Sequence, residues 1–136
     1  MTLLGGMDIG GTKCAVTLGR VKEQGVELLV TQRFPTPSTP QETIDLLMDS
    51  MERLLEEKHS DEPLQAIGIS CGGPLDSRLG LILSPPNLPG WDRIDCVTPI
   101  RERFGVPVGL QNDANACALA EWKWGAGKGT KNMIFL

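Results

Sequence analysis

The sequence predicts an α/β fold with a mixed sheet, in which an antiparallel three-strand meander is flanked by helices. Three apolar segments open the chain with only short turns between them, which is typical of antiparallel strands. A long segment with helical periodicity comes next, and a further short apolar segment follows it, which gives the order β-β-β-α-β. With 136 residues, 40% of them hydrophobic, the chain has the size and composition of one globular unit.

The meander begins with two strands joined at a pair of glycines. The heptad Met7-Asp8-Ile9-Gly10-Gly11-Thr12-Lys13 ends the first strand, and the apolar residues 14–18 form the second. We expect Gly10 and Gly11 to adopt the positive φ angles of a tight hairpin turn, because glycine reaches these angles without a steric penalty. After a polar turn, residues 26–34 form the third strand.

A long helix is predicted from Pro40 onwards. Thr39 and Glu42 have the spacing of a capping box, and proline suits the first helical position. The apolar residues of this segment recur at helical spacing and form one stripe, which we expect to face the sheet: Ile44, Leu47, Met48, Met51, Leu54 and Leu55. A buried strand at residues 64–71 follows this helix.

The second half of the chain alternates loops with further elements. The proline-rich residues 84–91 predict a rigid loop that would suit the wall of a pocket. We expect a strand pair at residues 79–83, a short helix at 99–104 and a strand at 106–111. A long buried helix at residues 112–124 and a last strand at 132–136 would follow.

The heptad has the composition of a phosphate-binding loop. Its two glycines leave backbone N–H groups open to an anion, Thr12 adds a hydroxyl donor and Lys13 adds a positive charge. Asp8 is placed to hold Mg²⁺ through a water molecule. A Walker A loop is excluded because Thr12 precedes Lys13, and no G-x-G-x-x-G spacing is present. A plain hairpin turn remains the alternative interpretation.

Asp113 is the candidate general base. It follows a predicted strand and Asn112 and opens a predicted helix, whose N-terminus would favour the anionic carboxylate. The alternative is that Asp113 only caps this helix. Ser70 lies in a G-x-S-x-G match, but the Gly-Gly-Pro after it is a poor helix start and the only histidine, His59, precedes it. A Ser-His-Asp hydrolase is therefore not expected.

Composition argues against several classes of function. The net charge of −4 and the pI near 5.0 argue against nucleic-acid binding. The four cysteines stand far apart without a C-x-x-C pair, so neither a zinc knuckle nor a redox dithiol is indicated. The chain shows no targeting signal and no apolar run near the ~18 residues of a membrane span. We therefore expect a cytoplasmic protein with reduced thiols and no membrane partner.

The chain resembles the ROK family (repressors, uncharacterised reading frames and sugar kinases), and within it the bacterial glucokinase branch. Four motifs carry the resemblance: Asp8-Ile9-Gly10-Gly11-Thr12-Lys13, Gly72-Gly73-Pro74, residues 84–91 and Asn112-Asp113-Ala114-Asn115-Ala116. The resemblance implies an actin-like ATPase (ribonuclease H-like) fold and ATP- and Mg²⁺-dependent phosphorylation of a glucose-like hexose. Residues 1–130 would be the N-terminal lobe, and residues 131–136 the first strand of a truncated second lobe.

The resemblance also implies roles for single residues. The catalytic aspartate of the family falls on Asp113, and its first phosphate loop falls on Asp8, Gly10, Gly11, Thr12 and Lys13, with Mg²⁺ held by Asp8 through water. Sugar contacts would come from Gly73, Asn87, Asn112 and Asp113. Where the family often has Gly-x-Pro-Gly-Pro, this chain has Ser70-Cys71-Gly72-Gly73-Pro74, which leaves the choice of hexose open.

Further motifs of the family would lie beyond Leu136, namely a second phosphate loop, more sugar contacts and a structural zinc motif. We therefore expect the isolated chain to be inactive as a kinase, and the resemblance implies a homodimer at full length. The alternative is the sugar-sensing domain of a ROK-family transcriptional repressor. A repressor carries a helix-turn-helix ahead of the glycine motif, and the six residues before Met7 leave no room for one if Met1 is the native start.

Overall fold

A computed structural model describes residues 3–23, 25–58, 62–72, 75–76, 78–83, 88 and 90–112. Within these ranges two helices are found, α1 (Pro40–Lys58) and α2 (Val97–Phe104). The strands are β1 (Leu3–Ile9), β2 (Lys13–Lys22), β3 (Gly25–Pro35), β4 (Leu64–Cys71), β5 (Leu75–Asp76), β6 (Leu81–Leu83), β7 (Asp92–Asp95) and β8 (Val108–Asn112). None of the helices in these ranges combines the length and apolarity that crossing a membrane requires.

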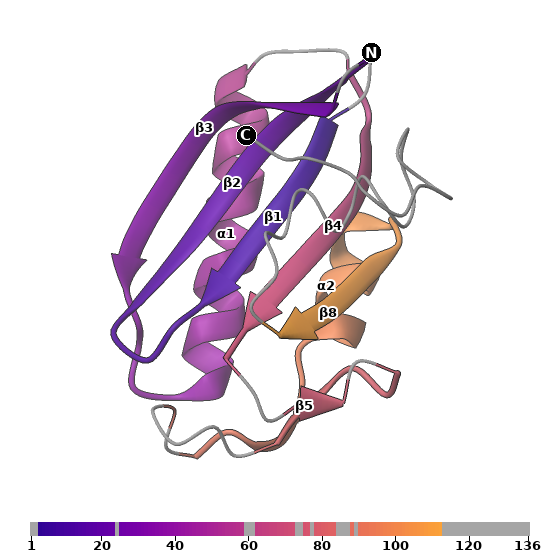
Figure 1. Ribbon diagram of the computed structural model, residues 1–136. Coiled ribbons are helices and arrows are strands. Elements are labelled where there is room, and N and C mark those ends of the chain that lie inside the picture. Colours follow the sequence, from indigo (N-terminus) through magenta and orange to yellow (C-terminus); the bar gives the residue numbers. More distant parts are fainter. Residues whose placement is uncertain are drawn as a thin grey trace.

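The main sheet has the strand order β3-β2-β1-β4-β8 (Figure 1). Strands β1, β2 and β3 pair antiparallel, whereas β4 lies parallel to β1, and β8 lies parallel to β4. The mixed sheet, the three-strand meander and the order β-β-β-α-β are therefore confirmed. Because β1 lies at the centre, its carboxyl end is flanked by the β1–β2 turn on one side and by the end of β4 on the other.

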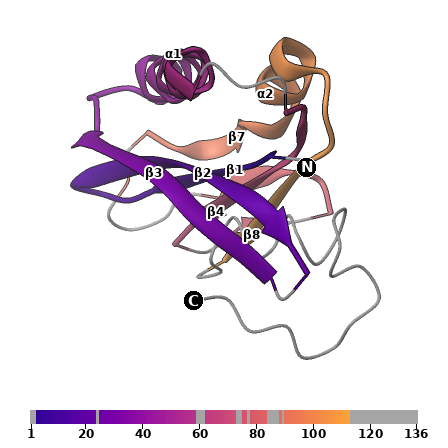
Figure 2. The ribbon, with the colours of Figure 1, turned by 90° about the horizontal axis from the view of Figure 1, so that it is seen from above.

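Helix α1 has the predicted start and the predicted apolar stripe. The Thr39 hydroxyl oxygen accepts a hydrogen bond from the backbone N–H of Glu42 at 3.2 Å, as an N-cap does. The sixth residue of the stripe, Leu55, is partly buried and packs against the same core. The other five residues are buried: Ile44, Leu47, Met48, Met51 and Leu54. Figure 2 shows α1 and α2 on the same face of the sheet, where they cover its core side.

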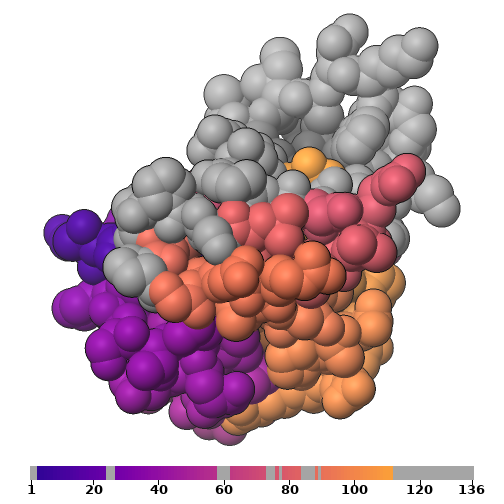
Figure 3. All heavy atoms as spheres, turned by 90° about the horizontal axis from the view of Figure 1, so that it is seen from below, coloured from indigo at the N-terminus to yellow at the C-terminus, as the bar shows by residue number. Residues whose placement is uncertain are grey.

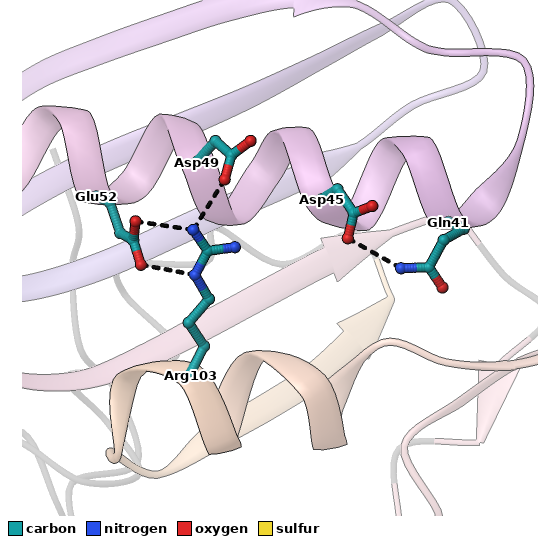
Figure 4. Close-up of polar contacts among 5 residues, drawn as sticks. All are labelled: Gln41, Asp45, Asp49, Glu52 and Arg103. Atoms are coloured by element: carbon teal, nitrogen blue, oxygen red, sulfur yellow. Dashed lines mark hydrogen bonds and ion pairs between the residues drawn. The ribbon is translucent and has the colours of Figure 1, made fainter.

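One arginine ties the two helices together (Figure 4). Arg103, in the last turn of α2, donates two hydrogen bonds to the Glu52 carboxylate, at 2.6 and 2.8 Å, and one to Asp49 at 2.8 Å. Glu52 and Asp49 lie one turn apart on α1, so a single guanidinium bridges two turns of the facing helix.

Beyond β4, the structure differs from the sequence prediction. Only residues 81–83 of the expected strand pair form a strand, and β6 pairs with β5 and β7 in a second, three-stranded sheet. The carboxylate of Asp76 accepts the N–H groups of Arg78 and Leu79, and Gly80 has a φ of 72°, so residues 78–80 form a turn instead. In Figure 3, which shows the molecule from below, the described residues of β5, β6 and β7 form a pink to orange band across one end of the molecule.

Two element boundaries also move. Helix α2 begins at Val97 and not at residue 99, because the Asp95 carboxylate accepts the N–H of Thr98 at 2.9 Å and fixes the first turn earlier. Strand β8 covers Val108–Asn112 and not residues 106–111. The helix expected at residues 112–124 falls outside the described residues except for Asn112, which ends β8. The strand expected at residues 132–136 and most of the loop at 84–91 are also outside them.

Candidate functional site

Three parallel strands end at one edge of the main sheet (Figure 1). The register places Ile9, Cys71 and Asn112 side by side in one row, at the carboxyl ends of β1, β4 and β8. Because neighbouring strands lie about 4.8 Å apart, the end of β8 lies about 10 Å from the end of β1. Ligands of open α/β sheets bind at such an edge, so the loops that follow these strands are where a site is expected.

The turn between β1 and β2 is closed by one backbone hydrogen bond, from Gly10 N–H to the Lys13 carbonyl at 3.1 Å. The predicted positive φ angles are wrong, because among the described glycines these angles occur at Gly80, Gly90 and Gly105 and not at Gly10 or Gly11. Glycine is required at position 10 for a steric reason instead. A Cβ atom there would lie 2.6 Å from the Lys13 carbonyl oxygen, which belongs to the backbone and cannot swing aside.

The tip of this turn carries several hydrogen-bond donors. No hydrogen bond within the described residues uses the backbone N–H of Gly11 or of Thr12. The side chains of Thr12 and Lys13 are exposed beside them. Two N–H groups, a hydroxyl and an ammonium on one short turn form an arrangement that suits an anion such as a phosphate group.

Thr36, which follows β3, donates two hydrogen bonds to this turn. Its N–H donates to the Thr12 carbonyl at 2.9 Å, and its hydroxyl donates to the Gly10 carbonyl at 2.7 Å. The buried thiol of Cys14 lies 3.4 Å from the same hydroxyl oxygen. Burial raises the pKa of this thiol. Because the Thr36 hydroxyl donates its one hydrogen to Gly10, the thiol is the donor in its contact with Thr36.

Asp8 is paired with a serine on the neighbouring strand. Asp8 and Ser70 are register partners of β1 and β4, and the Ser70 hydroxyl donates to Asp8 Oδ1 at 2.9 Å. The Ser70 side chain is buried and the Asp8 side chain is exposed. The bond therefore orients one carboxylate oxygen from the protein side and leaves the carboxylate accessible to solvent.

The other predicted site residues fall at the edge of the described structure or outside it. Asn112 is the last residue of β8, next to Cys71 in the register, and only its backbone is described. Gly73, Asn87 and Asp113 lie outside the described residues. The structure therefore brings the turn at residues 10–13 and Asp8 together, and places the residue before Asp113 on the same sheet edge.

Sequence reasoning missed the roles of Ser70 and Thr36. The sequence places Ser70 in a hydrolase-like match and in the segment 70–74, and neither pattern predicts its bond to Asp8. Among the described residues β4 ends at Cys71 and the next element is the strand β5, whereas a nucleophile elbow turns directly into a helix. One signal in the sequence was available for Ser70. It is a polar residue that alternates along the strand with the apolar Ile67, Ile69 and Cys71 and therefore lies on the opposite face of the sheet. No local signal marked Thr36, because its partners are 24 and 26 residues away in the sequence.

The residues present fit Mg²⁺ bound to a nucleotide better than a metal held by the protein alone. Mg²⁺ in such sites is held by one or two carboxylates, water and phosphate oxygens. Asp8 supplies one accessible carboxylate, and within the described ranges no group of three or more His, Cys, Asp or Glu side chains surrounds a metal position.

Comparison with known proteins gives a consistent result. The family model described as "ROK family" matches residues 4–136. The glucokinase of Streptomyces coelicolor is 36% identical over 134 residues, covering 98% of this chain and 40% of that protein. The fructokinase of Zymomonas mobilis is 34% identical, with 98% and 44% covered. A ROK family glucokinase from Streptomyces griseus, solved with glucose and AMPPNP, aligns with a TM-score of 0.69 at 34% identity, over 93% of this chain and 38% of that one.

The share of each relative that is covered, and the presence of a repressor among the relatives, both bear on function. The chain spans about 40% of the length of the first two relatives. The similar proteins also include the xylose repressor of Bacillus subtilis, which is 31% identical over 114 residues, covering 82% of this chain and 29% of the repressor.

Proposed function

Because the chain belongs to the ROK family, we propose that it is the N-terminal lobe of an ATP-dependent kinase that phosphorylates a hydroxyl of a glucose-like hexose. The observation that supports this proposal most directly is the turn at residues 10–13, in which the N–H groups of Gly11 and Thr12 have no hydrogen-bond partner among the described residues. This turn directly follows β1, whose Asp8 is exposed. The residue that precedes Asp113 ends a parallel strand on the same edge of the sheet. The turn that we propose binds phosphate and the residue before the candidate base therefore lie at one edge of the sheet.

In this proposal, the turn binds the phosphate groups of ATP. The N–H groups of Gly11 and Thr12, the Thr12 hydroxyl and the Lys13 ammonium would donate to phosphate oxygens. Asp8 would hold Mg²⁺ through a water molecule, and the ion would supply charge neutralisation for phosphoryl transfer. Positioning and charge neutralisation are the main requirements of this reaction, so no nucleophilic side chain is needed.

Asp113 would accept the proton of the sugar hydroxyl that attacks the γ-phosphoryl group. It directly follows Asn112, whose Cα lies about 10 Å across the sheet from the end of β1, which leaves room for a sugar hydroxyl and a phosphoryl group between them. Gly73, Asn87 and Asn112 are proposed to contact the sugar, since asparagine side chains both donate to and accept from hydroxyl groups.

The test is a panel of hexoses and amino-hexoses with Mg·ATP, measured on the full-length protein that contains this chain. We expect phosphorylation of at least one hexose, and we expect Asp113→Asn to lower kcat about 10²- to 10⁴-fold. Asparagine caps a helix as well as aspartate does, so the variant keeps its folding stability if capping is the only other role. Turnover that survives Asp113→Asn would show that this residue is not the base.

Four finer statements belong to the same proposal. The 136-residue chain alone is expected to show no hexose-dependent ADP release, because it spans less than half of its kinase relatives. A cytoplasmic location, a homodimer at full length and a zinc motif beyond Leu136 are proposed from the family resemblance. Size-exclusion chromatography with light scattering and metal analysis of the full-length protein test the last two.

A sugar-sensing domain of a transcriptional repressor is the second candidate function, favoured by the similarity to the xylose repressor. That similarity covers less of this chain than the kinase similarities do, and at lower identity. A repressor would bind operator DNA in a sugar-dependent manner without phosphorylating the sugar. A mobility-shift assay beside the kinase panel separates the two functions.

A further inference from the structure

We propose that Thr36 is a positioning residue that sets the orientation of the phosphate loop, residues 10–13. The inference rests on the proposed function, because it takes the anion of this loop to be the phosphate of a nucleotide. Thr36 lies outside the loop, in the segment between β3 and α1, and it donates hydrogen bonds to the backbone carbonyls of Gly10 and Thr12 in the loop.

The two hydrogen bonds of Thr36 fix the direction of two peptide units. In a planar trans peptide, the carbonyl of one residue and the N–H of the next point in opposite directions. The Gly10 carbonyl accepts from the Thr36 hydroxyl at 2.7 Å, so the N–H of Gly11 points away from Thr36. The Thr12 carbonyl accepts a hydrogen bond from the Thr36 N–H at 2.9 Å, and this bond fixes the peptide unit between Thr12 and Lys13 in the same way. Thr36 therefore aims a donor at the anion without touching it.

A buried thiol orients the Thr36 hydroxyl in turn. A hydroxyl has one hydrogen, which the Gly10 carbonyl accepts, so the contact of 3.4 Å with Cys14 is one in which the thiol donates. The hydrogen-bond chain then runs from the Cys14 thiol through the Thr36 hydroxyl to the Gly10 carbonyl. Cys14 is buried and Thr36 is half-buried, whereas Thr12 and Lys13 are exposed.

The experiment replaces the hydroxyl in the full-length protein. Thr36→Val keeps the shape and the backbone N–H but removes the hydroxyl, and Thr36→Ser keeps the hydroxyl. We expect Thr36→Val to raise the KM for Mg·ATP about fivefold to tenfold, with the KM for the hexose unchanged, and Thr36→Ser to restore the KM for Mg·ATP to within about twofold of the wild type.

A control variant comes from the main sheet. The Thr17 hydroxyl shares a hydrogen bond of 3.1 Å with the hydroxyl of Thr31, on β2 and β3, several residues from the loop. Thr17→Val removes an equivalent hydroxyl, and we expect it to leave both KM values unchanged. A loss of nucleotide affinity that Thr17→Val reproduces would be a general effect on the sheet and would overturn the proposal.

Direct binding of a non-hydrolysable ATP analogue, measured by calorimetry with Mg²⁺, keeps the test independent of turnover. Weaker binding by Thr36→Val than by the wild type and Thr36→Ser supports the proposal even if none of the tested sugars is phosphorylated. Equal binding by all three overturns it while leaving the kinase proposal intact. Wild-type protein that binds no nucleotide and phosphorylates no sugar overturns both.

Discussion

The Ser70 hydroxyl donates a hydrogen bond of 2.9 Å to the Asp8 carboxylate across two adjacent parallel strands. Ser70 is buried on the sheet, whereas Asp8 is exposed, two residues before the turn at residues 10–13. One carboxylate oxygen is thus oriented by the fold, and a carboxylate that holds Mg²⁺ through water depends on such an orientation.

Removal of this hydroxyl is the first prediction. In the full-length protein, Ser70→Ala leaves Asp8 without its partner, so we expect a higher Mg²⁺ concentration for half-maximal activity and a fall in kcat of about fivefold to tenfold. The measurement is a Mg²⁺ titration of kinase activity at saturating ATP and hexose.

Ser50 offers a matched control for this substitution. Ser50 lies on α1, is also buried, and its hydroxyl has no hydrogen-bond partner within the described part of the chain. We expect Ser50→Ala to leave the Mg²⁺ titration unchanged and the free energy of unfolding unchanged or slightly higher, because it removes an unpaired polar atom. Superimposable Mg²⁺ curves for all three proteins would show that Ser70 does not orient a metal-binding Asp8.

Replacement of Gly10 by alanine is the second prediction. The new Cβ would lie 2.6 Å from the Lys13 carbonyl oxygen, so the turn must open. We expect a loss of about 1–3 kcal/mol in the free energy of unfolding, measured by urea denaturation. Gly72→Ala is the control, since a Cβ at Gly72 would meet no atom of the described residues within 4 Å, and this substitution should cost much less. Equal losses for both variants would contradict the steric explanation.

Gly10 also shows where the sequence was informative and where it was not. The doublet of glycines marked the turn, but the reason for glycine is a contact with Lys13 and not a positive φ. A contact distance depends on how the turn closes, which composition does not reveal. The strands of the meander and α1 were predictable because apolar residues that recur at a regular spacing over many positions are compatible with few other secondary structures.

The actin-like fold class implied by the family resemblance is confirmed by the similarity to solved ROK kinases. The small second sheet was not predicted, because β5, β6 and β7 are two to four residues long. Strands this short carry too little periodicity to be recognised. The contacts of Thr36 and Ser70 were not predictable for a different reason, since each joins residues far apart in the sequence that only the sheet register brings together.

The bridge from Arg103 to α1 gives the third prediction. Arg103→Ala removes the bonds to Glu52 and Asp49, but all three side chains are between 33% and 54% exposed. Solvent screening therefore limits the expected loss to below about 1 kcal/mol of unfolding free energy. Arg101→Ala on the same helix is the control, because no ion pair within the described residues involves Arg101.

The same bridge should depend on pH. The hydrogen bond from Arg103 lowers the pKa of Glu52 below its ordinary value of 4.5. A lowered pKa in the folded state means that the stabilisation is present above pH 4.5 and is lost as the pH falls through the lowered value. The difference in unfolding free energy between the wild type and Arg103→Ala should accordingly shrink below pH 4.5. A difference that stays constant down to pH 3 would mean that the loss comes from packing alone.

The last prediction concerns the buried thiol of Cys96 at alkaline pH. Burial, with smaller contributions from Cys71 and Asp95, raises the pKa of Cys96 from 9.0 to about 12. Because the pKa is raised in the folded state, the stabilisation is complete below pH 9 and is lost between pH 9 and 12, at roughly 1.4 kcal/mol per pH unit. The chain contains no tyrosine, so no phenol titrates in this range. Urea denaturation from pH 8 to 10.5 should show a shallower decline for Cys96→Ala than for the wild type, whereas two parallel declines would mean that the thiol ionises equally in both states.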